Sequence, residues 1–145
     1  MCLRMAARYA PEAYNEVGSA LSGKHVEASS PPVSCAAVLA RRMGASEMHA
    51  VMAAGFAGGI GLSGGACGAL GAAVWIIGMN VLKEGGKVDY KASRALDTID
   101  RFIRCSEYEF ECSKIAGRTF ESVSDHASYV RDGGCSRIIE VLAAK

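Results

Sequence analysis

Residues 48–82 read MHAVMAAGFAGGIGLSGGACGALGAAVWIIGMNVL, without a single charged side chain. An apolar segment of this length could cross a bilayer. Nine glycines between Val51 and Leu82 interrupt it, and five of them fall within residues 58–65. Because glycine weakens a helix interior, we expect two shorter apolar helices of the kind that pack inside a protein core. The sequence therefore predicts no membrane insertion.

Helical periodicity continues on both sides of this segment, and alternating strand patterns are absent from the sequence. The expected helices cover residues 2–21 (as one helix or two short ones), 34–43, 46–55, 65–82, 90–110 (the longest surface helix), one or two short pieces between 112 and 130, and 135–144. Ser34 and Ser46 are suited to cap the second and third of these. The sequence predicts an all-α fold, a single compact helical domain of about six to seven helices with the glycine-rich segment in its middle. Residues 1–33 are expected to form an N-terminal helical arm and linker, and residues 34–145 the domain.

The composition and charge of the chain argue against several classes of function. The chain has 145 residues, of which half are hydrophobic and 21% are charged, and its formal net charge is +1. This balance, with Arg41-Arg42 as the longest basic run, predicts no nucleic-acid binding. Arg4 and Arg8 interrupt the N-terminus, so we expect no secretory signal and a cytoplasmic location. The high apolar content is compatible with a homodimer.

Six cysteines are the main chemical feature of the sequence. In a reducing compartment, cysteines serve as metal ligands, redox thiols or small buried hydrophobes. Cys35, Cys67 and Cys135 are each predicted to open a helix, where free N–H groups and the helix dipole favour a thiolate. We therefore expect lowered thiol pKa values there. Cys112 lies in a polar stretch from which a loop could turn it inward.

The remaining two cysteines are given incidental roles. Cys2 is near the terminus and Cys105 is expected inside the longest helix, seven residues before Cys112. Cys105 is a reserve candidate for a redox partner.

A set of glycines near Cys67 is also a candidate for the site. Without Cβ atoms, these residues allow the backbone to approach a bulky anionic group. An alternative is that they only permit close helix crossing, and the sequence leaves both open. The candidate cofactor-binding residues are Gly58, Gly59, Gly61, Gly64 and Gly65.

Four segments together resemble a known family. Ser34-Cys35-Ala36-Ala37-Val38-Leu39 resembles its opening cysteine motif, and residues 55–61 with Ala66-Cys67-Gly68-Ala69-Leu70-Gly71 resemble its central glycine–cysteine signature. Cys112 before Ser113-Lys114-Ile115 and Cys135 before Ser136-Arg137-Ile138 resemble its two later cysteines. The family is that of the redox-active C-GCAxxG-C-C proteins of bacteria and archaea.

The resemblance covers about residues 34–145 and implies a helical domain with four functional cysteines. These map to Cys35, Cys67, Cys112 and Cys135, as catalytic thiols or as metal ligands. A prokaryotic source and redox activity are also implied. The sequence departs from the family pattern in residues 1–33 and in adding Cys2 and Cys105.

Three chemistries follow from four such cysteines. The first is electron transfer through a Cys-ligated iron–sulfur cluster, of which a 2Fe–2S centre is the leading form. The second is thiol–disulfide exchange without metal, with Cys67 as the attacking thiol. The third is a structural zinc site with four thiolates. We rank them in this order.

The sequence leaves other questions open. No general acid–base constellation is recognisable, so it does not decide whether the protein is an enzyme, and it does not identify the redox partner. His25, His49 and His126 are scattered, and each is expected to be a surface or satisfied polar group rather than a ligand.

Overall fold

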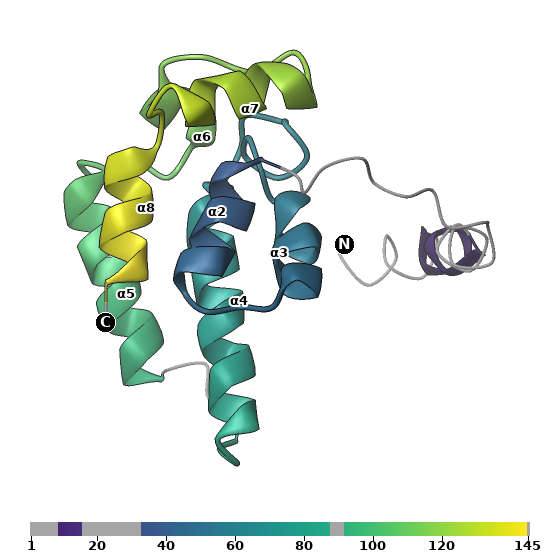
Figure 1. Cartoon of the computed structure of the whole chain (residues 1–145), viewed down its shortest axis with the longest axis vertical. Coiled ribbons are helices and arrows are strands. Elements are labelled where there is room, and N and C mark those ends of the chain that lie inside the picture. Colours follow the sequence, from purple (N-terminus) through teal and green to yellow (C-terminus); the bar gives the residue numbers. More distant parts are fainter. Residues whose placement is uncertain (1–8, 16–32, 88–91, 145) are drawn as a thin grey trace. The chain divides into compact units, whose positions relative to one another are not determined.

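The computed structural model of the chain describes residues 9–15, 33–87 and 92–144, which are mostly helical and contain no strand (Figure 1). The chain divides into two units, Met1–Ser30 and Pro31–Lys145. Within the first unit, residues 9–15 are helical, and the rest of the helix expected over 2–21 lies outside the described residues. The prediction of an all-α fold is confirmed.

The described part of the second unit contains seven helices, labelled as in Figure 1. They are α2 (Cys35–Arg42), α3 (Glu47–Ala54), α4 (Gly68–Lys83), α5 (Ser93–Cys105), α6 (Cys112–Ala116), α7 (Val123–Arg131) and α8 (Ser136–Ala143). The predicted caps of the first two are present. The Ser34 hydroxyl accepts a hydrogen bond from the N–H of Ala37 at 3.1 Å, and Ser46 accepts one from the N–H of His49 at 3.3 Å.

Two predicted helix boundaries are wrong. The helix expected over 90–110 is α5, which ends at Cys105 because Glu107 and Tyr108 adopt left-handed backbone conformations, with φ of 55° and 66°. The helix has 13 residues, fewer than expected. The expected start of α4 at residue 65 or 66 is also too early, because that part of the chain pairs with residue 111 instead.

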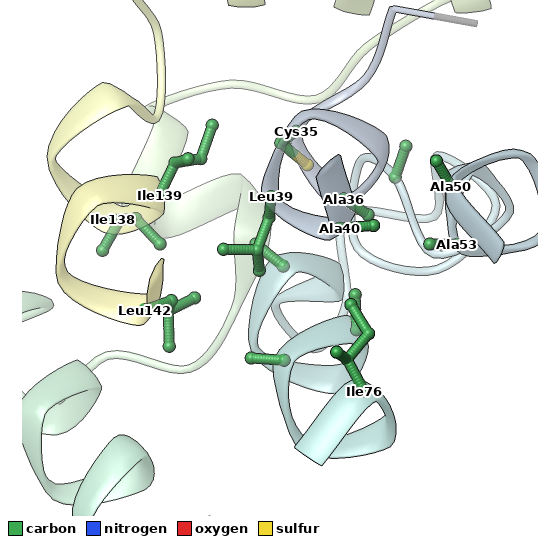
Figure 2. Close-up of a cluster of buried hydrophobic side chains, with 14 of the residues drawn as sticks. Cys35, Ala36, Leu39, Ala40, Ala50, Ala53, Ile76, Ile138, Ile139 and Leu142 are labelled. Atoms are coloured by element: carbon green, nitrogen blue, oxygen red, sulfur yellow. The ribbon is translucent and has the colours of Figure 1, made fainter. Parts of the chain in front are cut away.

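Helix α2 lies at the centre of the core, packed against α3, α4 and α8 (Figure 1). Its buried face includes three alanines as well as Cys35 and Leu39, and small side chains allow neighbouring helices to approach closely. Figure 2 shows Cys35 at the start of α2, above Leu39, and both belong to the same buried cluster as the α8 residues Ile138 and Ile139. The first cysteine is therefore part of the hydrophobic core.

Gly68 lets the start of α4 pack against Phe56, at the beginning of the turn that follows α3. A Cβ atom built on Gly68 would lie 1.6 Å from the carbonyl oxygen of Phe56, which no side chain could tolerate. The close approach holds the adjacent Cys67 next to the glycine-rich turn. None of the described helices is both long and apolar enough to span a membrane.

Candidate functional site

All four family cysteines lie at the beginning of a helix. Cys35 and Cys112 are the first residues of α2 and α6, and Cys67 and Cys135 are the N-caps of α4 and α8. The prediction of helix starts holds for Cys35, Cys67 and Cys135 and extends to Cys112. Cys35 and Cys112 are buried, with 3% and 6% of their surfaces exposed, whereas Cys67 and Cys135 are partly buried.

A short backbone pairing brings Cys67 and Cys112 together, although they are far apart in sequence. Ala66 and Glu111 form an isolated antiparallel bridge. The N–H of Cys67 donates to the carbonyl of Phe110 at 2.8 Å, and the N–H of Cys112 donates to the carbonyl of Gly65 at 2.6 Å. The main chain itself therefore sets the spacing of these two residues.

Cys35 is the acidic thiol of the group. A hydrogen bond from the Cys135 thiol makes the largest contribution in lowering the pKa of Cys35 from its ordinary value of 9.0 to about 5. Burial opposes this shift, while a hydrogen bond and charge from His126 and the backbone N–H of Gly58 assist it. At neutral pH the pair therefore carries one thiolate, on Cys35, and one thiol, on Cys135.

The other three thiols shift in the opposite direction. The pKa of Cys135 is raised, first by its hydrogen bond to Cys35 and then by burial. Burial raises the pKa of Cys67, and burial followed by the charges of Cys35 and Cys67 raises that of Cys112 to about 11. Because each of the three responds to the charge on Cys35, the four sulfurs share one electrostatic neighbourhood.

These directions correct one sequence expectation. A helix start was expected to lower the pKa of Cys67 and Cys135 as well as that of Cys35. At Cys67 the N–H groups of Leu70 and Ala69 do act in that direction, but burial outweighs them. At Cys135 the interaction with the Cys35 sulfur is the largest cause, and burial and the negative charge of Cys35 add to it. Like charges placed close together cannot all be stabilised, so one thiolate suppresses the others.

The candidate glycines differ in what they contact. The N–H of Gly58, which has φ of 63°, hydrogen-bonds to Cys35. A Cβ on Gly59 would lie 2.5 Å from the backbone nitrogen of Gly65, so this glycine serves close backbone packing. Gly61 has open space around it, and Gly64 lies against Thr119 and Ser113. Gly58 thus acts on a cysteine sulfur and Gly59 serves close packing, while the role of these glycines beside a bulky anionic group stays a prediction.

His126 and Tyr129 on α7 are additional site residues that the sequence interpretation missed. His126 is only 1% exposed and packs edge-on against Phe120, with 4.8 Å between ring centroids. It also contributes to lowering the pKa of Cys35. Its Nε2 has no hydrogen-bond partner among the described residues. Tyr129 hydrogen-bonds to Cys135, and its own pKa is raised, first by burial. Their spacing of three on a helix capped by Ser122 placed both on one face, a signal available in the sequence.

Within the part of the chain that the structure describes, the cysteine sulfurs are not grouped as metal ligands. The five cysteines within the described ranges are free thiols. Among those same ranges, no three His, Cys, Asp or Glu side chains are grouped so that they could hold a metal ion. Thiolates suit iron and zinc chemically, but in this geometry they do not form a coordination shell.

Comparison with known proteins agrees with the cysteine pattern. The profile of one family matches residues 33–145 and is described as "Putative redox-active protein (C_GCAxxG_C_C)". No curated protein and no solved structure matches the chain. Since the match covers most of the chain, including all four cysteines, the chain belongs to the C_GCAxxG_C_C family of redox-active proteins.

Proposed function

We propose that the protein performs thiol–disulfide exchange, with Cys35 and Cys135 as the redox pair. Cys35 and Cys135 lie at the starts of α2 and α8, which pack against each other, and each thiol shifts the pKa of the other so that the charge is held on Cys35; this pairing carries the proposal. It supports a contact between two sulfurs that belong to different helices and are separated widely in sequence. This reverses the order in which we ranked exchange and cluster chemistry from sequence.

The two thiols have different access to other molecules. Cys35 is buried in the core, whereas Cys135 lines a surface pocket of about 610 Å³. An external thiolate would therefore attack the Cys135 sulfur of a Cys35–Cys135 disulfide. The bond between the two protein sulfurs breaks, a mixed disulfide forms on Cys135, and Cys35 leaves as a thiolate. A second thiol of the reductant then attacks its own sulfur in the mixed disulfide, releasing the oxidised reductant and the Cys135 thiolate, which takes up a proton.

The low pKa of Cys35 favours this direction of electron flow. A thiol of low pKa is a good leaving group, and stabilising the reduced form of a pair makes its disulfide easier to reduce. At pH 7, about two pH units above the pKa of about 5, ionisation of Cys35 stabilises the reduced form by about 3 kcal/mol relative to a pair whose Cys35 stays protonated. This corresponds to about 60 mV in the two-electron reduction potential. The oxidised protein is therefore expected to accept electrons from dithiols.

A second candidate function is electron transfer through an iron–sulfur cluster held by Cys35, Cys67, Cys112 and Cys135. The observation in its favour is the shared electrostatic neighbourhood of all four sulfurs. When bound, a cluster would supply one-electron chemistry. The side chains would first have to rearrange, because within the described ranges they form no metal-holding group. A structural zinc site would require the same rearrangement of the side chains.

The experiment that separates these functions is anaerobic purification with iron, sulfide and zinc analysis, followed by mapping of disulfides after mild oxidation. The proposal expects no stoichiometric metal and a reversible Cys35–Cys135 disulfide. Stoichiometric iron and sulfide, lost in Cys67→Ser, would support the cluster instead. Stoichiometric zinc without a redox response would support the structural site. A Cys2→Ser variant serves as a control that removes a cysteine outside the family set.

The proposed thiol chemistry also bears on the compartment and on the redox partner. Free thiols persist in a reducing compartment, so we propose that the protein works in the cytoplasm. The redox partner would be a thiol-bearing molecule able to reach Cys135.

A further inference from the structure

Cys105 shares the surface pocket with Cys135. The pocket of about 610 Å³ is lined by both cysteines, together with Tyr129, Lys114 and Arg137 among others. Cys105 is the last residue of α5, Cys135 is the N-cap of α8, and these two helices pack against each other (Figure 1). The C-terminal end of one helix thus meets the N-terminal end of the other at a single solvent-accessible hollow.

The position of Cys105 differs from the one expected from sequence. The sequence placed it inside a long helix, where a cysteine packs as a small hydrophobe. In the structure the helix ends at Cys105, and it is followed by a turn in which Glu107 and Tyr108 are left-handed and exposed to solvent. Cys105 is partly buried against the core and also lines a second hollow of about 360 Å³ beside Arg101 and Arg137. It is therefore reachable, unlike Cys35.

Cys135 interacts with a buried cysteine and shares a pocket with an accessible one. On its inner side it hydrogen-bonds to Cys35. On its outer side it lines the pocket with Cys105. A disulfide on Cys135 could therefore have either neighbour as its second sulfur.

We propose that Cys105 is a third redox thiol, which takes over the disulfide from the buried pair by internal exchange. The inference rests on the proposed function of Cys35 and Cys135. The Cys105 thiol loses its proton to water in the pocket and attacks the Cys135 sulfur. The Cys35–Cys135 bond breaks, a Cys105–Cys135 bond forms, and Cys35 leaves as a thiolate. No electrons enter or leave the protein in this step.

The exchange would give the protein two oxidised forms with different exposure. In the first, one sulfur of the disulfide is buried in the core. In the second, both sulfurs line the pocket, where an external thiol can attack either one. The internal exchange would thus replace a disulfide with one buried sulfur by a disulfide whose two sulfurs are both accessible.

The test oxidises the full-length protein and its Cys35→Ala variant with diamide, blocks remaining thiols, and maps disulfides by mass spectrometry. Cleavage after glutamate separates Cys105 from Cys112, because Glu107, Glu109 and Glu111 lie between them. The proposal expects a Cys105–Cys135 cross-link in Cys35→Ala, and its loss when Cys105→Ala is added. Cys2→Ala added to Cys35→Ala is the matched control, and it should keep the cross-link. Circular dichroism verifies that each variant is folded.

The outcomes distinguish this inference from the function on which it rests. A wild-type protein that forms Cys35–Cys135, with a folded Cys35→Ala variant that forms no Cys105–Cys135 bond, would overturn the inference alone. A wild-type protein without any Cys35–Cys135 bond would overturn the proposed function. If Cys35→Ala does not fold, Cys105→Ala replaces it. This variant should retain the Cys35–Cys135 disulfide but lose the Cys105–Cys135 species seen in oxidised wild type, and absence of that species from wild type would refute the exchange.

Discussion

Replacing Cys135 with alanine should raise the pKa of Cys35, because the hydrogen bond from Cys135 makes the largest contribution in lowering it. A hydrogen bond to a charged group contributes about 1.5–3 kcal/mol. At about 1.4 kcal/mol for each pKa unit, its loss corresponds to a rise of about one to two units. The pKa of Cys35 should therefore move from about 5 to about 6–7, still below 9.0 because His126 and Gly58 remain.

The assay is the ultraviolet absorbance of the thiolate, followed by pH titration of the reduced, metal-free protein. Near pH 6, the thiolate fraction of Cys35 should fall from about 90% in the wild type to about half or less in Cys135→Ala. Cys135→Ser, which keeps a hydroxyl donor, should lie between the two. The same titration of Cys35→Ala assigns the signal, since the acidic thiolate should then vanish.

A matched control is Cys105→Ala, which removes a sulfur from the same pocket without touching the hydrogen bond to Cys35. Its titration midpoint should equal that of the wild type. Equal midpoints in Cys135→Ala and the wild type would refute the reasoning, because Cys135 would then not contribute to the low pKa of Cys35. A wild type without any thiolate at pH 7 would refute the assignment of Cys35 itself.

Three further predictions concern stability. Gly68→Ala should destabilise the fold by about 3 kcal/mol or prevent folding, because the new Cβ would lie 1.6 Å from the Phe56 carbonyl oxygen; chemical denaturation measures this. Gly71→Ala, in the same helix but with nothing within 4 Å of the new Cβ, should stabilise by about 0.5–1 kcal/mol, and a loss of stability there would contradict the packing of α4. Between pH 5 and 9 the unfolded chain holds a proton on Cys35 that the folded chain has released, so reduced wild type should gain stability over Cys35→Ala as pH rises, by up to about 1.4 kcal/mol per pH unit. The gain should be absent below pH 5, and a difference that does not vary with pH would show that Cys35 folds as a thiol.

The helices were predictable from local signals, and their ends were less so. Ser34 and Ser46 mark helix starts through a single side-chain hydrogen bond, which a sequence displays directly. The end of α5 depends on left-handed conformations at Glu107 and Tyr108, residues that do not usually adopt them. The late start of α4 depends on pairing with residue 111, a contact that only the tertiary fold creates.

For the site, the choice of four cysteines came from the family pattern, and their position at helix starts came from glycine and serine neighbours. The chemical differences among them could not be predicted in this way. A helix start acts similarly on every thiol, whereas burial and the charge of Cys35 act differently on Cys67 and Cys135. Both influences come from residues distant in sequence, as does that of His126.

The bridge between Ala66 and Glu111 has a consequence for evolution of this protein. The hydrogen bonds that hold Cys67 beside Cys112 join only main-chain atoms. The four main-chain groups belong to residues 65, 67, 110 and 112, so the side chains of Ala66 and Glu111 take no part in these bonds. The side chains at positions 66 and 111 can therefore change while Cys67 and Cys112 keep their spacing.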